Sequence, residues 1–409
     1  MAYFSLYSFS LASYLPSKNS CTFINFLIAP VIFLNLKFFT MQLNKCIKKW
    51  LAVLLLLNAG GIATAQSVDG WYKILTGKMG NYDAVMHLHK TNKNYSGYLW
   101  FKQIQVPMQL LYTEAKTGDS LILNSHNGSE NYLLAGVINE HSFTGTAQLF
   151  QDDATPQLAK FELQVSNDKI YTPFNYYYTE GFAKLLPQYK NPSDCQYTAS
   201  VIWPAINNSA ATPYKTEIRQ LLGITTPVEE IGRWLIDAKN QYIADWRSSS
   251  AKFTPKVIMD KGSALMLHEE LRLMVMFENE RNITLADYGF AYTGGAHGTS
   301  ATSISTFAKL TNKLLKLSDI FNAAGMQQLS PILEKVARAQ FNIKNTKTLM
   351  QNGFTVLKIK PSTNFYITDE GVGFVYAPYA IKPLAEGQIN LLIPFTMLKG
   401  YLQPGVLAK

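Results

Sequence analysis

A series of short apolar segments separated by turn residues runs from Trp71 to Val165 and constrains the fold more than any other feature. None of these segments has a helical period, and each has the length and composition of a β-strand. Asn127-Gly128 and Thr117-Gly118-Asp119 lie between segments and are typical of hairpin turns. The segments are residues 84–88, 95–101, 108–112, 120–123, 131–138, 142–149 and 160–165. The pattern predicts an all-β meander domain over residues 67–170, either a barrel or a sandwich.

Residues 171–192 contain several prolines and no regular period, so they are predicted to be a linker. A helical pattern follows between Pro227 and Ser248, where apolar residues recur at steps of three and four. Strand-like segments return at residues 265–279, 285–292, 302–317, 365–368, 372–376 and 389–393. A short helix is expected at Ile320, and another from Pro331, because proline favours the first position of a helix. Residues 193–409 are therefore predicted to form an α+β domain with an antiparallel sheet and packed helices.

The segment that begins at Met41 has the three parts of a secretion signal. Three lysines come first, an apolar run over residues 51–57 is too short to span a bilayer, and Ala63-Thr64-Ala65 forms a cleavage site. We expect a signal peptide over residues 41–65, export, and no membrane span in the mature chain. Residues 1–40 have no period and are interpreted as upstream sequence outside the true protein. The alternative is a first membrane segment over residues 23–39, which polar residues and Pro30 interrupt.

Export would also change the charge and the cysteine content. The first 66 residues contain five lysines and no acidic residue, so their removal would lower the formal net charge from +9 to about +4. The remaining basic residues form no dense run interleaved with aromatic residues, which argues against a nucleic-acid partner. Only Cys195 would remain of the three cysteines, so no internal disulfide is expected. A buried structural thiol is the simpler interpretation of Cys195, and a nucleophile is the alternative.

The segment Tyr292-Thr293-Gly294-Gly295-Ala296-His297-Gly298 is the most unusual in the sequence, because three glycines surround one histidine between predicted strands. Glycines permit positive φ and expose backbone N–H groups, and imidazole exchanges protons near neutral pH. A tight strand connection with a structural histidine is the simpler alternative. Aromatic residues of the later hairpin could add a platform, although core packing would also explain them. The candidate ligand-binding residues are Tyr292, Thr293, Gly294, Gly295, His297, Tyr376 and Tyr379.

Two further chemistries are considered. His297 could be a general base oriented by a carboxylate such as Asp287. His87 and His89 would share one side of a strand and could begin a zinc site, but no third ligand is evident. An apolar inner face and a polar outer face explain these two histidines more simply. We therefore predict no metal and no cofactor.

The chain resembles a known family in three ordered segments: residues 292–298, Leu-Ser-Asp-Ile-Phe at 317–321, and Phe-Tyr-Ile-Thr-Asp-Glu-Gly-Val-Gly-Phe-Val-Tyr-Ala-Pro-Tyr-Ala-Ile at 365–381. Over roughly residues 195–402 it is similar to the extracytoplasmic domain of unknown function 3298, which usually follows the domain of unknown function 4163. Such domains occur in RsiV-type anti-sigma factors that sense lysozyme and in PdaC-type peptidoglycan deacetylases. The resemblance implies a role at the cell wall.

The chain departs from both of these contexts. It has no sigma-binding segment joined to a transmembrane helix, and its six histidines contain no His-x-x-x-His pair of the kind a metal deacetylase needs. We therefore expect an exported cell-envelope protein, in the periplasm, at the cell surface or outside the cell. Its expected role is non-catalytic binding of a peptidoglycan fragment or of a protein partner such as lysozyme. The alternative is a peptidoglycan-directed hydrolase that uses His297 as general base.

Overall fold

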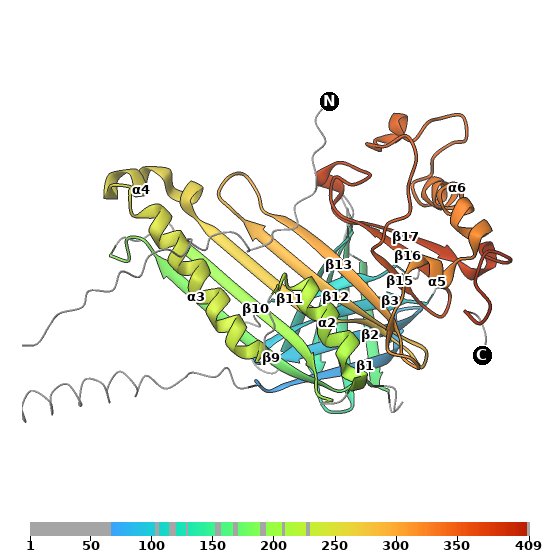
Figure 1. Cartoon of the computed structure of the whole chain (residues 1–409), viewed down its shortest axis with the longest axis horizontal. Coiled ribbons are helices and arrows are strands. Elements are labelled where there is room, and N and C mark those ends of the chain that lie inside the picture. Colours follow the sequence, from blue (N-terminus) through green and yellow to red (C-terminus); the bar gives the residue numbers. More distant parts are fainter. Residues whose placement is uncertain are drawn as a thin grey trace, which may run out of the picture. The chain divides into compact units, whose positions relative to one another are not determined.

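The structure is a computed structural model (Figure 1). It describes residues 67–102, 106–113, 120–127, 130–151, 157–166, 171–188, 194–206, 209–225 and 230–406. The predicted signal peptide over residues 41–65 and the residues before it lie outside this described part. The predicted turn at residues 117–119 and Gly128 also lie outside it.

Eight antiparallel strands in chain order close into a barrel, which confirms the predicted meander and selects the barrel over the sandwich. Each strand pairs with the next, and β1 also pairs with β8, which closes the sheet. The sequence pattern missed β1, because Lys73, Gly77 and Lys78 interrupt its apolar residues. The barrel strands are β1 (Gly70–Met79), β2 (Tyr82–Thr91), β3 (Asn94–Phe101), β4 (Met108–Thr113), β5 (Ser120–Asn127), β6 (Glu130–Ile138), β7 (Ser142–Gln151) and β8 (Gln157–Val165).

A six-stranded sheet follows the barrel in the sequence, in the order β14-β13-β12-β11-β10-β9. Neighbouring strands are antiparallel except β10 and β11, which are parallel because the connection between them is a helical crossover. The predicted antiparallel sheet is confirmed except at this one parallel pair. The strands are β9 (Phe174–Lys184), β10 (Asp194–Pro204), β11 (Leu267–Glu278), β12 (Asn282–Tyr292), β13 (Thr299–Ala308) and β14 (Lys313–Leu314).

The predicted linker over residues 171–192 is wrong over most of its described length, because it contains β9. This strand pairs with β10 from end to end. Its run of tyrosines and threonine at residues 176–179 has high strand propensity. Pro173 and Pro187 flank the strand and do not interrupt it, so the prolines mark its ends.

The helices of the crossover cover one face of this sheet. They are α2 (Thr212–Leu221), α3 (Ile231–Ser250) and α4 (Pro255–Lys261), with the 3-10 turns η1 (Ser209–Ala211) and η2 (Gly262–Leu265). The predicted amphipathic helix is confirmed as α3, which lies along β9 and β10 (Figure 1). Its apolar side packs with strand residues such as Tyr197 and Leu273. None of the helices in the described part of the chain is long and apolar enough to cross a lipid bilayer.

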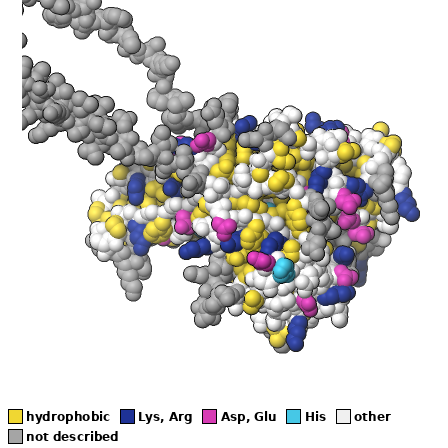
Figure 2. Space-filling model, turned by 90° about the horizontal axis from the view of Figure 1, so that it is seen from below, with side chains coloured by type: hydrophobic (Ala, Val, Ile, Leu, Met, Phe, Trp, Pro, Cys, Tyr) yellow, Lys and Arg dark blue, Asp and Glu magenta, His cyan; other side chains and the backbone are white. Residues whose placement is uncertain are grey.

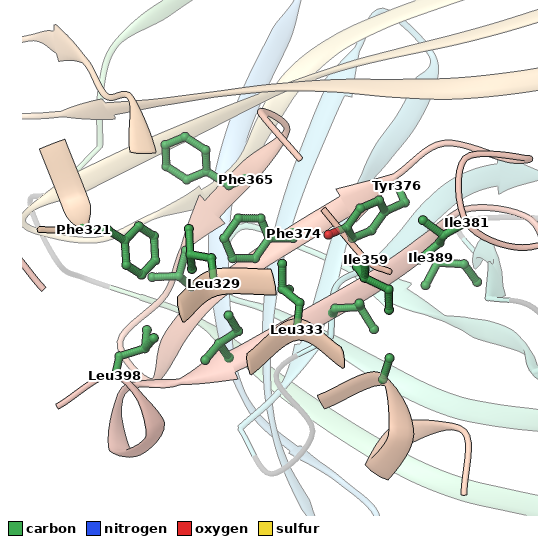
Figure 3. Close-up of a cluster of buried hydrophobic side chains, with 14 of the residues drawn as sticks. Phe321, Leu329, Leu333, Ile359, Phe365, Phe374, Tyr376, Ile381, Ile389 and Leu398 are labelled. Atoms are coloured by element: carbon green, nitrogen blue, oxygen red, sulfur yellow. The ribbon is translucent and has the colours of Figure 1, made fainter. Parts of the chain in front are cut away.

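The last part of the chain forms a small three-stranded sheet covered by α6 (Figure 3). The predicted start of this helix at Pro331 is wrong. The helix begins at Ala323, because the Asn322 side chain caps it by accepting the Gly325 N–H at 2.8 Å. Pro331 lies inside the helix on its exposed side. Proline has no N–H, and water can solvate the backbone carbonyl that is left without a donor. The elements are α5 (Leu317–Ile320), α6 (Ala323–Gln340), η3 (Met350–Asn352), β15 (Phe365–Ile367), β16 (Gly371–Tyr376), η4 (Leu384–Glu386), β17 (Ile389–Pro394) and η5 (Phe395–Met397).

The outer face of the barrel is covered where β2 and β3 meet β11. Tyr98 and Trp100 point out of the barrel and pack with Met274 and Met276 in one buried apolar cluster. The Trp100 indole N–H donates to the Met276 carbonyl at 3.2 Å. This outer face is therefore a second core, although strand alternation alone predicts that it faces water.

Candidate functional site

The loop of residues 293–298, here called the hairpin loop, joins β12 to β13 and has one defined conformation. The Tyr292 hydroxyl donates to the Gly295 carbonyl at 2.8 Å. Gly294 and Gly295 have φ values of 79° and 124°, which side chains rarely adopt. A Cβ on Gly294 would lie 2.4 Å from the Ala264 carbonyl oxygen, so only glycine fits there. The loop is preorganised by these contacts.

The hairpin loop is also accessible. Thr293, Gly295, Ala296 and His297 are all exposed, and Tyr292 is half-buried beneath them. Within the described part of the chain, the His297 side chain has no hydrogen bond or ion pair. The structural histidine bonded to a neighbouring carbonyl, which was the simpler alternative, is therefore not what the structure shows. The loop offers an imidazole and backbone N–H groups to a partner.

The structure separates His297 from its proposed orienter Asp287. Asp287 precedes Tyr292 by five residues on β12, which is ~17 Å along an extended strand. Since Thr299 pairs with Ala291, His297 lies beyond that end of the strand. A hydrogen bond between a base and its orienter needs about 3 Å, so the pairing of His297 with Asp287 is wrong.

Asp287 has an unusual environment of its own. It lies on the same face of β12 as Leu285, which belongs to the core under the helices. Its Oδ1 atom is enclosed and has no hydrogen-bond partner among the described residues. Burial raises the pKa of this carboxyl group to about 7. Asp287 is therefore a buried carboxyl group with a raised pKa on β12, away from the hairpin loop.

Tyr376 is a core residue and does not form a platform with Tyr292. It is 6 % exposed and packs in the cluster beneath α6 (Figure 3). Its hydroxyl donates to the Lys360 carbonyl at 2.9 Å. Its strand β16 pairs with β15 and β17, whereas Tyr292 belongs to the six-stranded sheet. Tyr376 is therefore wrong as a ligand-binding residue, since its aromatic ring is used for packing.

Tyr379 differs from Tyr376 in its exposure. It lies in the turn after β16, is 63 % exposed, and has a φ of 69°. A bulky residue in this region of φ is strained and needs the surrounding structure to hold it there. The structure thus keeps Tyr379 as an exposed aromatic side chain, on a segment separate from the hairpin loop.

His87 and His89 are buried structural groups between the barrel and β11. The Tyr72 hydroxyl lies 2.7 Å from Nδ1 of His87, and the Val275 N–H donates to Nε2 of His89 at 3.0 Å. Burial lowers the pKa of each imidazole to about 3, so both are neutral at physiological pH. In the part of the chain that the structure describes, no three His, Cys, Asp or Glu side chains are grouped to hold a metal.

Cys195 is a buried thiol at the centre of a small apolar cluster with Trp246 and Ala183. Burial raises its pKa to about 11, which keeps it protonated and unreactive at neutral pH. The structural interpretation of this cysteine is confirmed.

Comparison with known proteins supports the family resemblance for the end of the chain. Residues 318–396 match the family described as Protein of unknown function (DUF3298). A DUF3298 family structure from Bacteroides fragilis has a TM-score of 0.50 and 20% identity, over 57% of this chain and 96% of that chain. Another, from Pseudomonas aeruginosa PAO1, has a TM-score of 0.41 and 15% identity, over 57% and 95%. No curated protein matches the sequence. The hairpin loop lies outside the matched residues, and the preceding 4163 domain stays a prediction.

Proposed function

We propose that this chain is an exported cell-envelope protein that binds a partner through the hairpin loop and catalyses no reaction. The observation that carries this proposal is a loop that is both preorganised and exposed, with His297 free of any catalytic partner. Preorganisation lowers the entropic cost of binding, because the loop need not be ordered when the partner arrives.

The proposed partner is a wall component, and the form of the loop favours a protein over a glycan. A sugar chain is usually held in a groove with aromatic side chains on its walls, whereas this loop ends a hairpin and Tyr376 is buried away from it. A hairpin end with exposed backbone donors can enter the cleft of a concave protein. Lysozyme is the protein partner that the family resemblance suggests, and a peptidoglycan fragment is the other candidate.

Binding is best tested by titrating the purified protein with lysozyme and, separately, with soluble peptidoglycan fragments in a calorimeter. Gly294→Ala should weaken binding by about tenfold or more, because the new Cβ collides with the Ala264 carbonyl and displaces the loop. Gly353→Ala is the matched control, since Gly353 has a φ of 78° and no atom within 4 Å of an added Cβ. It should bind normally.

His297→Ala distinguishes the proposed binding role from hydrolysis. The substitution should weaken binding, and neither the natural protein nor the variant should release products from wall fragments. Turnover that His297→Ala abolishes would support the hydrolase instead. An absence of binding to either partner, with a folded sample, would refute the binding proposal. Export is tested separately by sequencing the N-terminus of the protein recovered from the envelope, where we expect Gln66.

A further inference from the structure

Two neighbouring segments of the last part of the chain, residues 355–360 and 376–381, form one surface, here called the Leu357 surface. The Thr355 N–H donates to the Ile381 carbonyl at 3.0 Å, and the Tyr376 hydroxyl donates to the Lys360 carbonyl at 2.9 Å. These contacts fix the segments side by side in opposite directions. Leu357 and Tyr379 lie near the middle of these two neighbouring segments.

The two segments divide their side chains between the core and the solvent. Ile359 and Ile381 are buried in the cluster beneath α6, beside Tyr376 (Figure 3). Leu357 and Tyr379 are 76 % and 63 % exposed. The buried residues around Tyr379 hold its backbone at a positive φ, although the Tyr379 ring itself is mostly exposed. Such strain is typical of residues kept for contact with a partner.

Most of the charge beside these apolar side chains is positive, and the nearby Glu386 is paired with Lys382 at 3.3 Å. Between Glu334 and Asp369 the sequence has six basic residues and no acidic residue. Five of these basic side chains have no ion pair within the described residues: Lys335 on α6 and, in the segments after that helix, Lys344, Lys347, Lys358 and Lys360. Figure 2 shows basic and acidic side chains mixed on the face seen from below.

The loop of residues 341–348 is held beside the Leu357 surface. Arg338 donates to the carbonyls of Lys344 and Lys347, and its guanidinium is paired with Glu334. The rings of Phe341 and Phe354 contact each other edge to face, which fixes this loop next to the start of residues 355–360. The loop that carries Lys344 and Lys347 thus lies beside the segment that carries Lys358 and Lys360.

We propose that the Leu357 surface docks on an anionic lipid bilayer. Leu357 and Tyr379 would enter the interface between headgroups and acyl chains, where amphipathic aromatic rings are favoured. The lysines would contact lipid phosphates while their alkyl stems cover apolar surface. An acidic protein fits less well, because a protein interface presents both signs of charge and hydrogen-bonding groups, whereas this surface has an excess of positive charge around two exposed apolar side chains.

Co-sedimentation of the full protein with vesicles tests this proposal. Vesicles of phosphatidylglycerol and phosphatidylcholine should bind it, those of phosphatidylcholine alone should not, and added salt should weaken binding. Leu357→Ser combined with Tyr379→Asn should weaken binding by about tenfold, and asparagine tolerates the positive φ at residue 379. Lys358→Gln combined with Lys360→Gln should weaken it by a similar factor of about ten.

A matched control tests whether replacing an exposed leucine elsewhere on the protein also weakens vesicle binding. Leu310 is 96 % exposed in the turn between β13 and β14, and Leu310→Ser should leave vesicle binding unchanged. The proposal is overturned if the natural protein does not sediment with anionic vesicles, or if Leu310→Ser weakens binding as much as the Leu357 variant does. It is also overturned if only the lysine substitutions matter, because any polyanion, including an acidic protein, would then suffice. His297→Ala should bind vesicles normally, which separates this result from the function of the hairpin loop.

Discussion

Acidification should destabilise the protein through His87 and His89, which lie between the barrel and β11. Both imidazoles are 1 % exposed and are neutral when folded, because burial lowers their pKa to about 3. In the unfolded chain they regain a pKa of about 6.5. The unfolded state therefore takes up protons below pH 6.5 that the folded state does not bind. This stability is fully present above pH 6.5 and is lost as the pH falls towards 3.

The expected loss follows from the interval between the unfolded pKa and the working pH. At pH 5, about 1.5 units below the unfolded pKa, each histidine lowers the free energy of unfolding by about 2 kcal/mol. The pair lowers it by about 4 kcal/mol. With a folded pKa of about 3, each buried ring stays neutral at pH 5. His89 has a further constraint, since the Val275 N–H already points at its Nε2.

Urea unfolding followed by tryptophan fluorescence at pH 5, 6, 7 and 8 would measure this loss. The comparison is with His87→Asn combined with His89→Gln, because an asparagine amide can replace Nδ1 and a glutamine amide can replace Nε2 as hydrogen-bonding groups. The variant should be less stable at pH 8, and the difference should shrink by about 4 kcal/mol at pH 5. Other titrating groups, including Asp287, cancel in the comparison. A difference that is independent of pH would refute the reasoning.

Two further substitutions test buried carboxyl groups. Asp287→Asn should stabilise the protein by about 2 kcal/mol at pH 8, after halving the effect for partial exposure. Burial raises the pKa of this group to about 7, and above that pH the folded protein must hold the carboxylate in its charged, desolvated form. At pH 5 less than half of the gain should remain, and an equal gain at both values would contradict this cause. Glu278→Gln should cost about 3 kcal/mol, because the enclosed carboxylate accepts from Lys309 at 2.7 Å and that ammonium would lose its counter-charge. Asp69→Asn is the control, because the exposed ion pair of Asp69 with Lys90 should contribute no more than about 1 kcal/mol. Equal losses of stability in Glu278→Gln and Asp69→Asn would contradict the role of burial.

The elements that could be predicted from the sequence are those whose pattern is local. The barrel follows from short alternating segments with turns between them, and α3 follows from apolar residues at helical spacing. Strand β9 was mistaken for a linker, because its neighbour β10 determines it and the flanking prolines resemble breaks within it. The start of α6 was misplaced, since a proline at the first position and a proline on the exposed side of a helix look alike in a sequence.

The sequence indicated the loop of the candidate site, but it did not indicate correctly which other residues lie beside that loop. The glycines at residues 293–298 indicated positive φ, which the structure shows at Gly294 and Gly295, but they left open whether His297 is exposed or structural. The pairing of Asp287 with His297 is wrong, although the predicted strand over residues 285–292 already implies that the two are far apart. Tyr376 is wrong because a local pattern does not show which sheet a strand joins. A signal for the buried outer face of the barrel was present in the outward-facing residues Tyr98 and Trp100. Aromatic residues at such alternate positions indicate a second packed surface.

That second packed surface decides how the binding site should be located. A truncation that begins near residue 191 would remove the barrel together with β9. It would expose Met274 and Met276 to water and leave the edge of β10 unpaired, and both changes favour aggregation. Loss of binding by such a fragment could then result from misfolding and would not identify the hairpin loop. Substitutions at exposed positions such as His297 and Leu357 leave this interface intact, so a loss of binding in those variants can be assigned to the contact that was changed.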